Sequence, residues 1–166
     1  AAALRAALAS DAAASAEQRL WALTRLAEIE ERRGRHAEAE AAFKAALALG
    51  LPDVYLLAAH ADFLLDRGRA GEVLTLLKGK ERSDLLLLRL ALAGKATSAP
   101  ETAAWADALS ARFDAARLRG DALHEKEEAR FALALRGETQ RALTLARSNY
   151  AVQREPSDAR VLLEAA

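Results

Sequence analysis

The stretch that decides the fold is residues 20–53, which read LWALTRLAEIEERRGRHAEAEAAFKAALALGLPD. Apolar residues recur at helical spacing before Gly34, and they do so again after it. These apolar positions are Leu23, Leu26, Ala27 and Ile29 before the glycine and Ala39, Ala42, Phe43, Ala46 and Leu47 after it. Helices commonly end with a residue in the left-handed conformation, which glycine adopts without a Cβ clash. The stretch therefore predicts two helices joined by a turn at Gly34.

The pattern returns 34 residues later, which indicates an internal repeat. Glycine marks the turn again at Gly68, and Gly137 lies close to two further periods beyond that position. An irregular repeat without a glycine turn would fill the interval. The matching pairs are Leu23 and Leu57, Ala27 and Ala61, Arg33 and Arg67, Gly34 and Gly68, Arg35 and Arg69, Glu38 and Glu72, and Lys44 and Lys78.

This periodicity predicts one all-α domain over residues 1–166, built from consecutive helix pairs. Residues 1–9 resemble the second helix of an earlier pair, because Leu4 and Leu8 share one face, and a linker would follow at 10–16. The predicted segments are a partial repeat at 1–16, repeats at 20–53, 54–87, 88–120 and 121–156, and a terminal helix at 157–166.

Capping residues predict where the later helices begin. After a helix over 83–94, Ser98 is positioned to cap the next helix, and Glu101 would complete its capping box. A further helix would run from Asp121 to Arg136. Following Pro156, either Ser157 or Asp158 would cap the final helix.

Composition narrows the function classes. Hydrophobic residues make up 52% and aromatic residues 5%, which favours helices packed through Ala and Leu. The 24 basic and 24 acidic residues cancel, so no global field attracts nucleic acid or an anionic membrane.

The absence of cysteine excludes disulfides and thiolate metal sites and leaves the cellular compartment open. Because the sequence holds no Met, we expect the natural start to be missing.

No membrane insertion is expected either. The most apolar run, Leu85 to Leu92, already contains Arg89 and falls short of the ~18 residues that a membrane-spanning helix needs. An alternative use of this run is assembly, in which it and the Ala-rich first helix would pack against another copy of the chain.

Residues 20–53 resemble a tetratricopeptide repeat. The family pattern places a large apolar residue, a small one, a turn glycine, and then Ala, an aromatic and Ala on the second helix. Pro52 stands one place later than the proline of the family, and the second copy departs from the pattern at His60, Val73 and Lys80. The matching positions are Leu23, Leu26, Ala27, Gly34, Ala39, Phe43 and Ala46.

The resemblance implies an α-α superhelix whose concave groove, lined by the first helix of each pair, holds a peptide or helix of a partner protein. Trp21 and Tyr55 share one repeat position, and Glu28 and Asp62 share another, so we expect a basic, partly apolar ligand. The groove residues implied are Trp21, Thr24, Glu28, Glu31, Tyr55, Ala58, Asp62, Leu65, Asp66, His124, Glu127, Glu128 and Phe131. Chaperone-binding members of the family hold the carboxylate of a peptide with Lys residues. This chain has Thr24 and Ala58 at the positions where Lys would be expected, so we do not expect it to bind chaperone tails.

Other interpretations of these residues stay open at this stage. The favoured interpretation of Trp21 and Tyr55 is that they are buried core aromatics, whereas the binding hypothesis requires at least one of them to be exposed. Each acidic residue could be a solvated helix face paired with a nearby Arg. His60 is expected to be a core histidine.

A catalytic function has little in the sequence to support it. His124 and Glu128 lie one helical turn apart and resemble part of a metalloprotease helix, but the second His is missing. No nucleophile elbow or phosphate-binding loop is present. We therefore expect no enzyme activity, no metal and no cofactor, and an acidic groove that repels nucleic acid.

Overall fold

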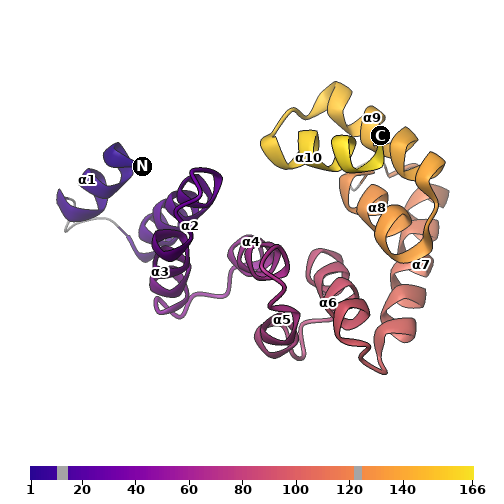
Figure 1. The fold of residues 1–166 in the computed structure, drawn as a ribbon, viewed down its shortest axis with the longest axis horizontal. Helices are drawn as coiled ribbons and strands as arrows, with labels where there is room; N and C mark the ends of the chain where they lie inside the picture. Colours follow the sequence, from indigo (N-terminus) through magenta and orange to yellow (C-terminus); the bar gives the residue numbers. More distant parts are fainter. Residues whose placement is uncertain (11–14, 122–124) are drawn as a thin grey trace. The chain divides into compact units, whose positions relative to one another are not determined.

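The computed structural model describes residues 1–10, 15–121 and 125–166, and every regular element in these ranges is a helix (Figure 1). The prediction of an all-α protein is therefore confirmed. The chain forms two compact units, Ala1–Arg69 and Ala70–Ala166. Within the described ranges, no helix is long and apolar enough to cross a membrane.

Unit 1, residues Ala1–Arg69, packs around Phe43. The ring is fully buried, stacks on His60 at a centroid distance of 4.9 Å and contacts Phe63 at 5.4 Å. His60 is thus a buried residue of the core, as expected. Figure 1 shows α2 and α3 side by side, and α4 contacts both. The helices are α1 (Ala2–Ser10), α2 (Ala16–Arg32), α3 (His36–Leu47) and α4 (Val54–Leu65).

The predicted glycine turn appears twice in unit 1 with the same geometry. Gly34 and Gly68 have φ angles of 72° and 67°, in the left-handed region. The amide of Arg35 donates to the Glu30 carbonyl at 2.9 Å, and that of Arg69 to the Leu64 carbonyl at 3.0 Å. These bonds satisfy carbonyls that each helix end would leave unpaired. The repeat is therefore visible as a repeated local structure.

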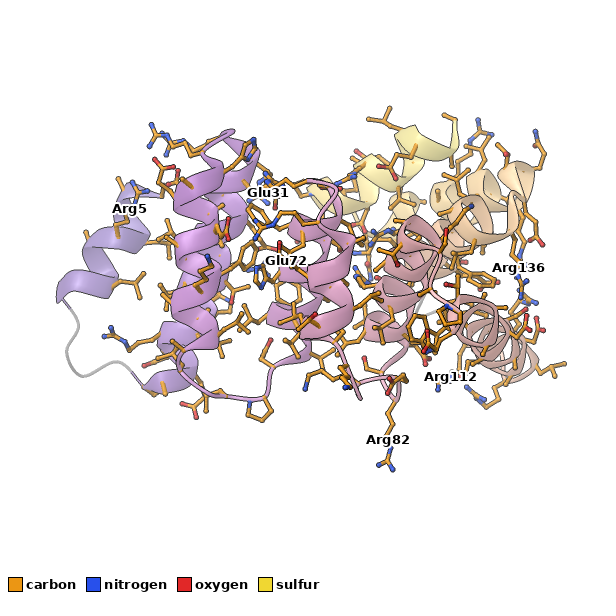
Figure 2. The ribbon with its side chains drawn as sticks, turned by 60° about the horizontal axis from the view of Figure 1, so that its bottom comes forward. Arg5, Glu31, Glu72, Arg82, Arg112 and Arg136 are labelled. Atoms are coloured by element: carbon orange, nitrogen blue, oxygen red, sulfur yellow. The ribbon has the colours of Figure 1, made fainter. Side chains whose placement is uncertain are left out.

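A buried carboxylate, that of Glu30, connects helix α1 to helix α2 at the start of unit 1. The Glu30 carboxylate is fully buried and lies 3.1 Å from Arg5 of α1, 3.7 Å from Arg33 and 3.8 Å from Arg35. Figure 2 shows Arg5 extending from α1 toward α2. Ser15 caps α2 through a capping box with Gln18, so it belongs to the helix start; residues 11–14 of the expected linker lie outside the described residues.

Unit 2, residues Ala70–Ala166, has two groups of buried residues. One joins α6 and α7 to Phe131, with Leu87, Leu88, Leu109 and Phe113. The other consists mainly of alanines between α8, α9 and α10. The helices are α5 (Ala70–Leu76), α6 (Asp84–Thr97), α7 (Thr102–Leu118), α8 (Glu125–Phe131), the π-helix η1 (Ala132–Arg136), α9 (Thr139–Val152) and α10 (Pro156–Ala165).

The leucine run in α6 is largely buried. Leu86, Leu87, Leu88 and Leu90 are all buried, and Leu87 and Leu88 belong to the core that joins α6 and α7. These leucines are therefore not available to another copy of the chain, whereas assembly through the Ala-rich first helix stays a prediction.

Two predicted helix starts are wrong. Ser98 does not cap the helix that follows it; with φ 55° it ends α6, and α7 begins after Glu101 without a side-chain capping bond. The last helix begins at Pro156 and is capped by Glu155, whose amide donates to Asp158 at 2.9 Å, so neither Ser157 nor Asp158 is the cap. In both cases a polar side chain near a proline can form more than one kind of local hydrogen bond with the backbone.

The predicted helix ending at Arg136 ends there, but its last turn is wider than an α-helix. Residues Ala132–Arg136 form the π-helix η1, which closes at Gly137 with φ 72°. Arg136 donates to Asp107 of α7 at 2.9 Å (Figure 2), and Lys95 of α6 donates to the Ala134 carbonyl. Side chains from two neighbouring helices thus hold the π-helical turn.

Candidate functional site

The two aromatic residues that share a repeat position are both exposed. Trp21 is 58% exposed and Tyr55 is 48% exposed, so the interpretation of these rings as core residues is wrong. The core positions are taken by the adjacent residues Leu20 and Leu56, which are almost fully buried. Each helix therefore directs its leucine inward and its aromatic residue outward.

A pocket of about 410 Å³ lies in unit 1 between the start of α2, the start of α4 and the loop before α4. Trp21 and Tyr55 both contribute to it, and Asp53 accepts a hydrogen bond from the Leu56 amide at 2.6 Å, which fixes the loop to α4. Most of the lining is apolar. The lining residues are Glu17, Leu20, Trp21, Thr24, Arg25, Leu51, Pro52, Asp53 and Tyr55.

Polar contacts hold the Tyr55 ring in place. Its hydroxyl donates to Glu28 Oε1 at 2.5 Å, while Arg25 donates to Glu28 Oε2 at 3.0 Å and to the Tyr55 hydroxyl at 2.7 Å. The Arg25 guanidinium also lies 4.9 Å from the centre of the Tyr55 ring. The exposed ring is therefore ordered before any ligand arrives, and the charge of Glu28 is matched by that of Arg25.

A second group of charges lies at the opposite ends of α2 and α4. We call Glu31, Asp62 and Asp66 the carboxylate cluster. Arg67 lies 3.2 Å from Glu31, and its guanidinium stacks 3.8 Å from the centre of the Phe63 ring. Burial raises the pKa of Glu31, Arg67 opposes this shift, and the charges of Asp66 and Asp62 raise that pKa further. Arg67 is thus the ion-pair partner of Glu31 at this end of the two helices.

The other groove residues expected in unit 1 are less accessible. Thr24 lines the pocket, but its hydroxyl already donates to the Leu20 carbonyl at 2.8 Å. Ala58 is buried and offers no surface to a ligand, and Leu65 is half-buried. The accessible part of the expected groove is therefore formed by the two aromatic rings and the acidic side chains.

The described groove residues expected from the fourth repeat do not lie on an open surface. Glu127, Glu128 and Phe131 are buried inside unit 2. The Glu128 carboxylate pairs with Arg117 of α7 and Arg141 of α9. Phe131 packs 5.4 Å from Phe113, so these side chains stabilise the unit.

His124, which with Glu128 resembles part of a metalloprotease helix, lies outside the described residues. Glu128, its expected partner, is held by Arg117 and Arg141. Among the described residues, no group of three or more His, Asp or Glu side chains is placed to hold a metal ion.

Sequence reasoning missed the residues that complete the pocket. Arg25 could have been found, because it lies one helical turn beyond Trp21 on the same face of α2. The loop residues Leu51 and Pro52 carry no such signal, since their contribution depends on how the loop folds back beside α2.

Comparison of the chain with family models, with curated proteins and with solved structures gives no match. The tetratricopeptide resemblance rests on the residues of the repeat alone.

Proposed function

We propose that this chain is a tetratricopeptide-like repeat protein without enzymatic activity that binds a segment of a partner protein. The observation that carries the proposal is the pair Trp21 and Tyr55, two exposed aromatic rings one repeat apart that border the same pocket. Exposed large aromatics beside an apolar hollow are typical of binding anchors, because ring burial on association is strongly favourable.

The order already present in the site supports the proposal. Tyr55 is held by Arg25 and Glu28, so little side-chain entropy is lost when a ligand covers its ring. The pocket volume of about 410 Å³ lies near the lower end of the range of roughly 300–1,000 Å³ common for ligand sites. That size suits one apolar side chain of a peptide together with part of its backbone.

The test selects peptides from a random dodecapeptide phage library on the immobilised full chain. Affinities are then measured from the fluorescence anisotropy of labelled peptides, a readout that does not depend on Trp21. We expect peptides whose affinity falls at least tenfold in Trp21→Ala and in Tyr55→Phe or Tyr55→Ala variants, with the largest loss when the ring is removed.

A Val152→Ala, Leu163→Ala variant is the matched control, since it removes two exposed apolar side chains from unit 2. It should bind the selected peptides as tightly as the wild type does. Peptides that bind the wild type and the Trp21→Ala, Tyr55→Ala variant equally would contradict the proposal, as would a library that yields no binder.

A further inference from the structure

Three arginines of unit 1 converge on a single carboxylate. Arg5 belongs to α1, Arg33 follows the end of α2, and Arg35 precedes the start of α3. Their guanidinium nitrogens lie 3.1, 3.7 and 3.8 Å from the carboxylate oxygens of Glu30. We call Arg5, Arg33 and Arg35 the arginine cluster. Separate parts of the chain thus bring positive charge to one place.

The charge of the arginine cluster is only partly balanced. One carboxylate, that of Glu30, faces three guanidinium groups, which leaves a formal excess of two positive charges. In the part of the chain that the structure describes, no other carboxylate forms an ion pair with a member of the cluster. Glu38 in the first turn of α3 would still leave an excess if it were counted, because Arg32 adds a further exposed cation at the end of α2.

The cluster is both held in place and open to solvent. The side chains of Arg5, Arg33 and Arg35 are 44%, 46% and 45% exposed, whereas that of Glu30 is 0% exposed. A guanidinium group has five N–H donors, so one carboxylate leaves most donors of the cluster available. The buried carboxylate orients these donors before any ligand arrives, which limits the side-chain entropy that binding would cost.

The start of α3 supplies further donors beside the cluster. Arg35 is the N-cap residue of α3, and no side chain caps this helix start with a hydrogen bond. The first amide groups of a helix have no partner within the helix, and its N-terminus carries about half a positive charge. These amides would therefore add to the attraction that the guanidinium groups exert on an anion.

From this arrangement we infer that the arginine cluster binds a phosphorylated serine or threonine of a partner protein. A phosphate monoester carries about −1.5 to −2 charges at neutral pH and three acceptor oxygens, which match the excess of two positive charges. Guanidinium groups bind phosphate through two parallel hydrogen bonds. A carboxylate side chain carries a single charge and matches the cluster less well. The inference does not depend on the pocket beside Trp21 and Tyr55.

The experiment uses short fluorescent peptides of Gly and Ala whose central residue is phosphoserine, Glu or Ser. Binding to the full chain is measured by fluorescence anisotropy at low and at physiological salt. We expect the phosphoserine peptide to bind at least tenfold more tightly than the Ser peptide, with the Glu peptide between them. The differences should shrink as the salt concentration rises, because exposed charges are screened.

Variants of the protein locate the contact. Arg33→Gln and Arg35→Gln should each weaken binding of the phosphoserine peptide about tenfold, because each removes a charged donor. Arg33→Lys should weaken it less, since Lys keeps the charge and loses the planar fork. Arg82→Gln is the matched control; it removes an exposed arginine of unit 2 (Figure 2) and should not change the affinity. Helix content and thermal unfolding verify that each variant is folded.

The possible failures are distinguishable. Equal binding of the phosphoserine and Ser peptides, or unchanged binding in an Arg33→Gln, Arg35→Gln variant, would overturn this inference and leave the proposed function standing. Loss of phosphoserine binding in Trp21→Ala would also overturn it, because the pocket would then be the site. Inorganic phosphate that competes as strongly as the peptide would contradict a protein partner, and vesicles of anionic phospholipid bound in place of the peptide would assign the cluster to a membrane surface.

Discussion

Unit 1 and unit 2 treat the residues expected to line a groove in opposite ways. In unit 1, Tyr55 is half-exposed, and Asp66 of the carboxylate cluster is exposed. In unit 2, Glu128 is only 6% exposed and pairs with two arginines, and Phe131 is 1% exposed. The difference shows that helical spacing specifies a side of a helix, whereas the neighbouring helices decide whether that side is open.

The physical cause lies in what covers each helix. In unit 2, α10 packs against both α8 and α9, and Arg117 and Arg141 reach Glu128 from α7 and α9. In unit 1, the described helices leave the face with Trp21 and Tyr55 uncovered. Four predictions test this comparison, beginning with the largest expected effect.

The first prediction contrasts a buried ring with an exposed one in unit 1. Phe43→Ala should lower the free energy of unfolding by about 3 to 5 kcal/mol, because the ring is fully buried against His60 and Phe63. Trp21→Ala, which removes an exposed ring, should cost no more than about 0.5 kcal/mol. Urea denaturation followed by circular dichroism measures both. Similar losses for the two variants would mean that Trp21 is also part of the core.

The second prediction contrasts the carboxylates of the two units. Glu128→Gln should cost about 1 to 3 kcal/mol, because it leaves Arg117 and Arg141 without their shared anion; their partial exposure keeps the loss below that of a fully buried pair. Asp66→Asn, at an exposed residue of the carboxylate cluster, should change stability by no more than about 0.5 kcal/mol. Equal losses in denaturant unfolding would break the comparison between the units.

The third prediction concerns a feature that the two units share. Gly34→Ala and Gly137→Ala should each cost about 1 to 2 kcal/mol, because both glycines have φ 72° and an added Cβ would contact nothing within 4 Å. The cost is therefore one of backbone conformation. Thermal and denaturant unfolding should give similar losses at the two positions; Gly71→Ala, at a helical position with ordinary φ, is the control and should not destabilise.

The smallest effect is a pH dependence of opposite sign at two carboxylates of unit 1. Hydrogen bonds from Arg69 and Lys44 lower the pKa of Glu40 from 4.5 to about 2. Its stabilisation is therefore present above pH 4.5 and is lost as the pH falls through about 2; solvent screening keeps it below about 1 kcal/mol. Burial raises the pKa of Glu31 above 4.5, so its contribution is complete below pH 4.5 and is lost as the pH rises through the folded-state pKa.

Unfolding measured from pH 2 to 7 separates these two residues. Glu40→Gln should make the loss of stability in acid shallower, and Glu31→Gln should remove a decline above pH 4.5. If both variants keep the pH dependence of the free energy of unfolding that the wild type has, neither carboxylate changes its environment on folding.

The helices and turns could be predicted closely because their signals are local. Gly34, Gly68 and Gly137 each end a helix in the left-handed region, as expected from their place after apolar runs. The structure differs at Ser98, because a serine two residues before a proline can end one helix as readily as begin the next.

The candidate site was only partly predictable. The helical repeat placed Trp21, Tyr55 and Glu28 near one another, and hydrogen bonds and the pocket bring them together. The contribution of Leu51 and Pro52 depends on how a loop folds back, and the partnership of Glu128 with Arg117 and Arg141 depends on which helices approach it. Neither the folding of the loop nor the approach of these helices produces a periodic pattern in the amino-acid sequence.

The amino-acid sequence by itself determined the helical class, the 34-residue period and the glycine turns, because helix propensity, apolar spacing and left-handed backbone conformation are properties of a few neighbouring residues. Only the tertiary structure decided that Trp21 and Tyr55 stay exposed beside a pocket while Glu128 and Phe131 become buried. Exposure and charge pairing arise between helices distant in the chain, and packing chooses which side of each helix remains open.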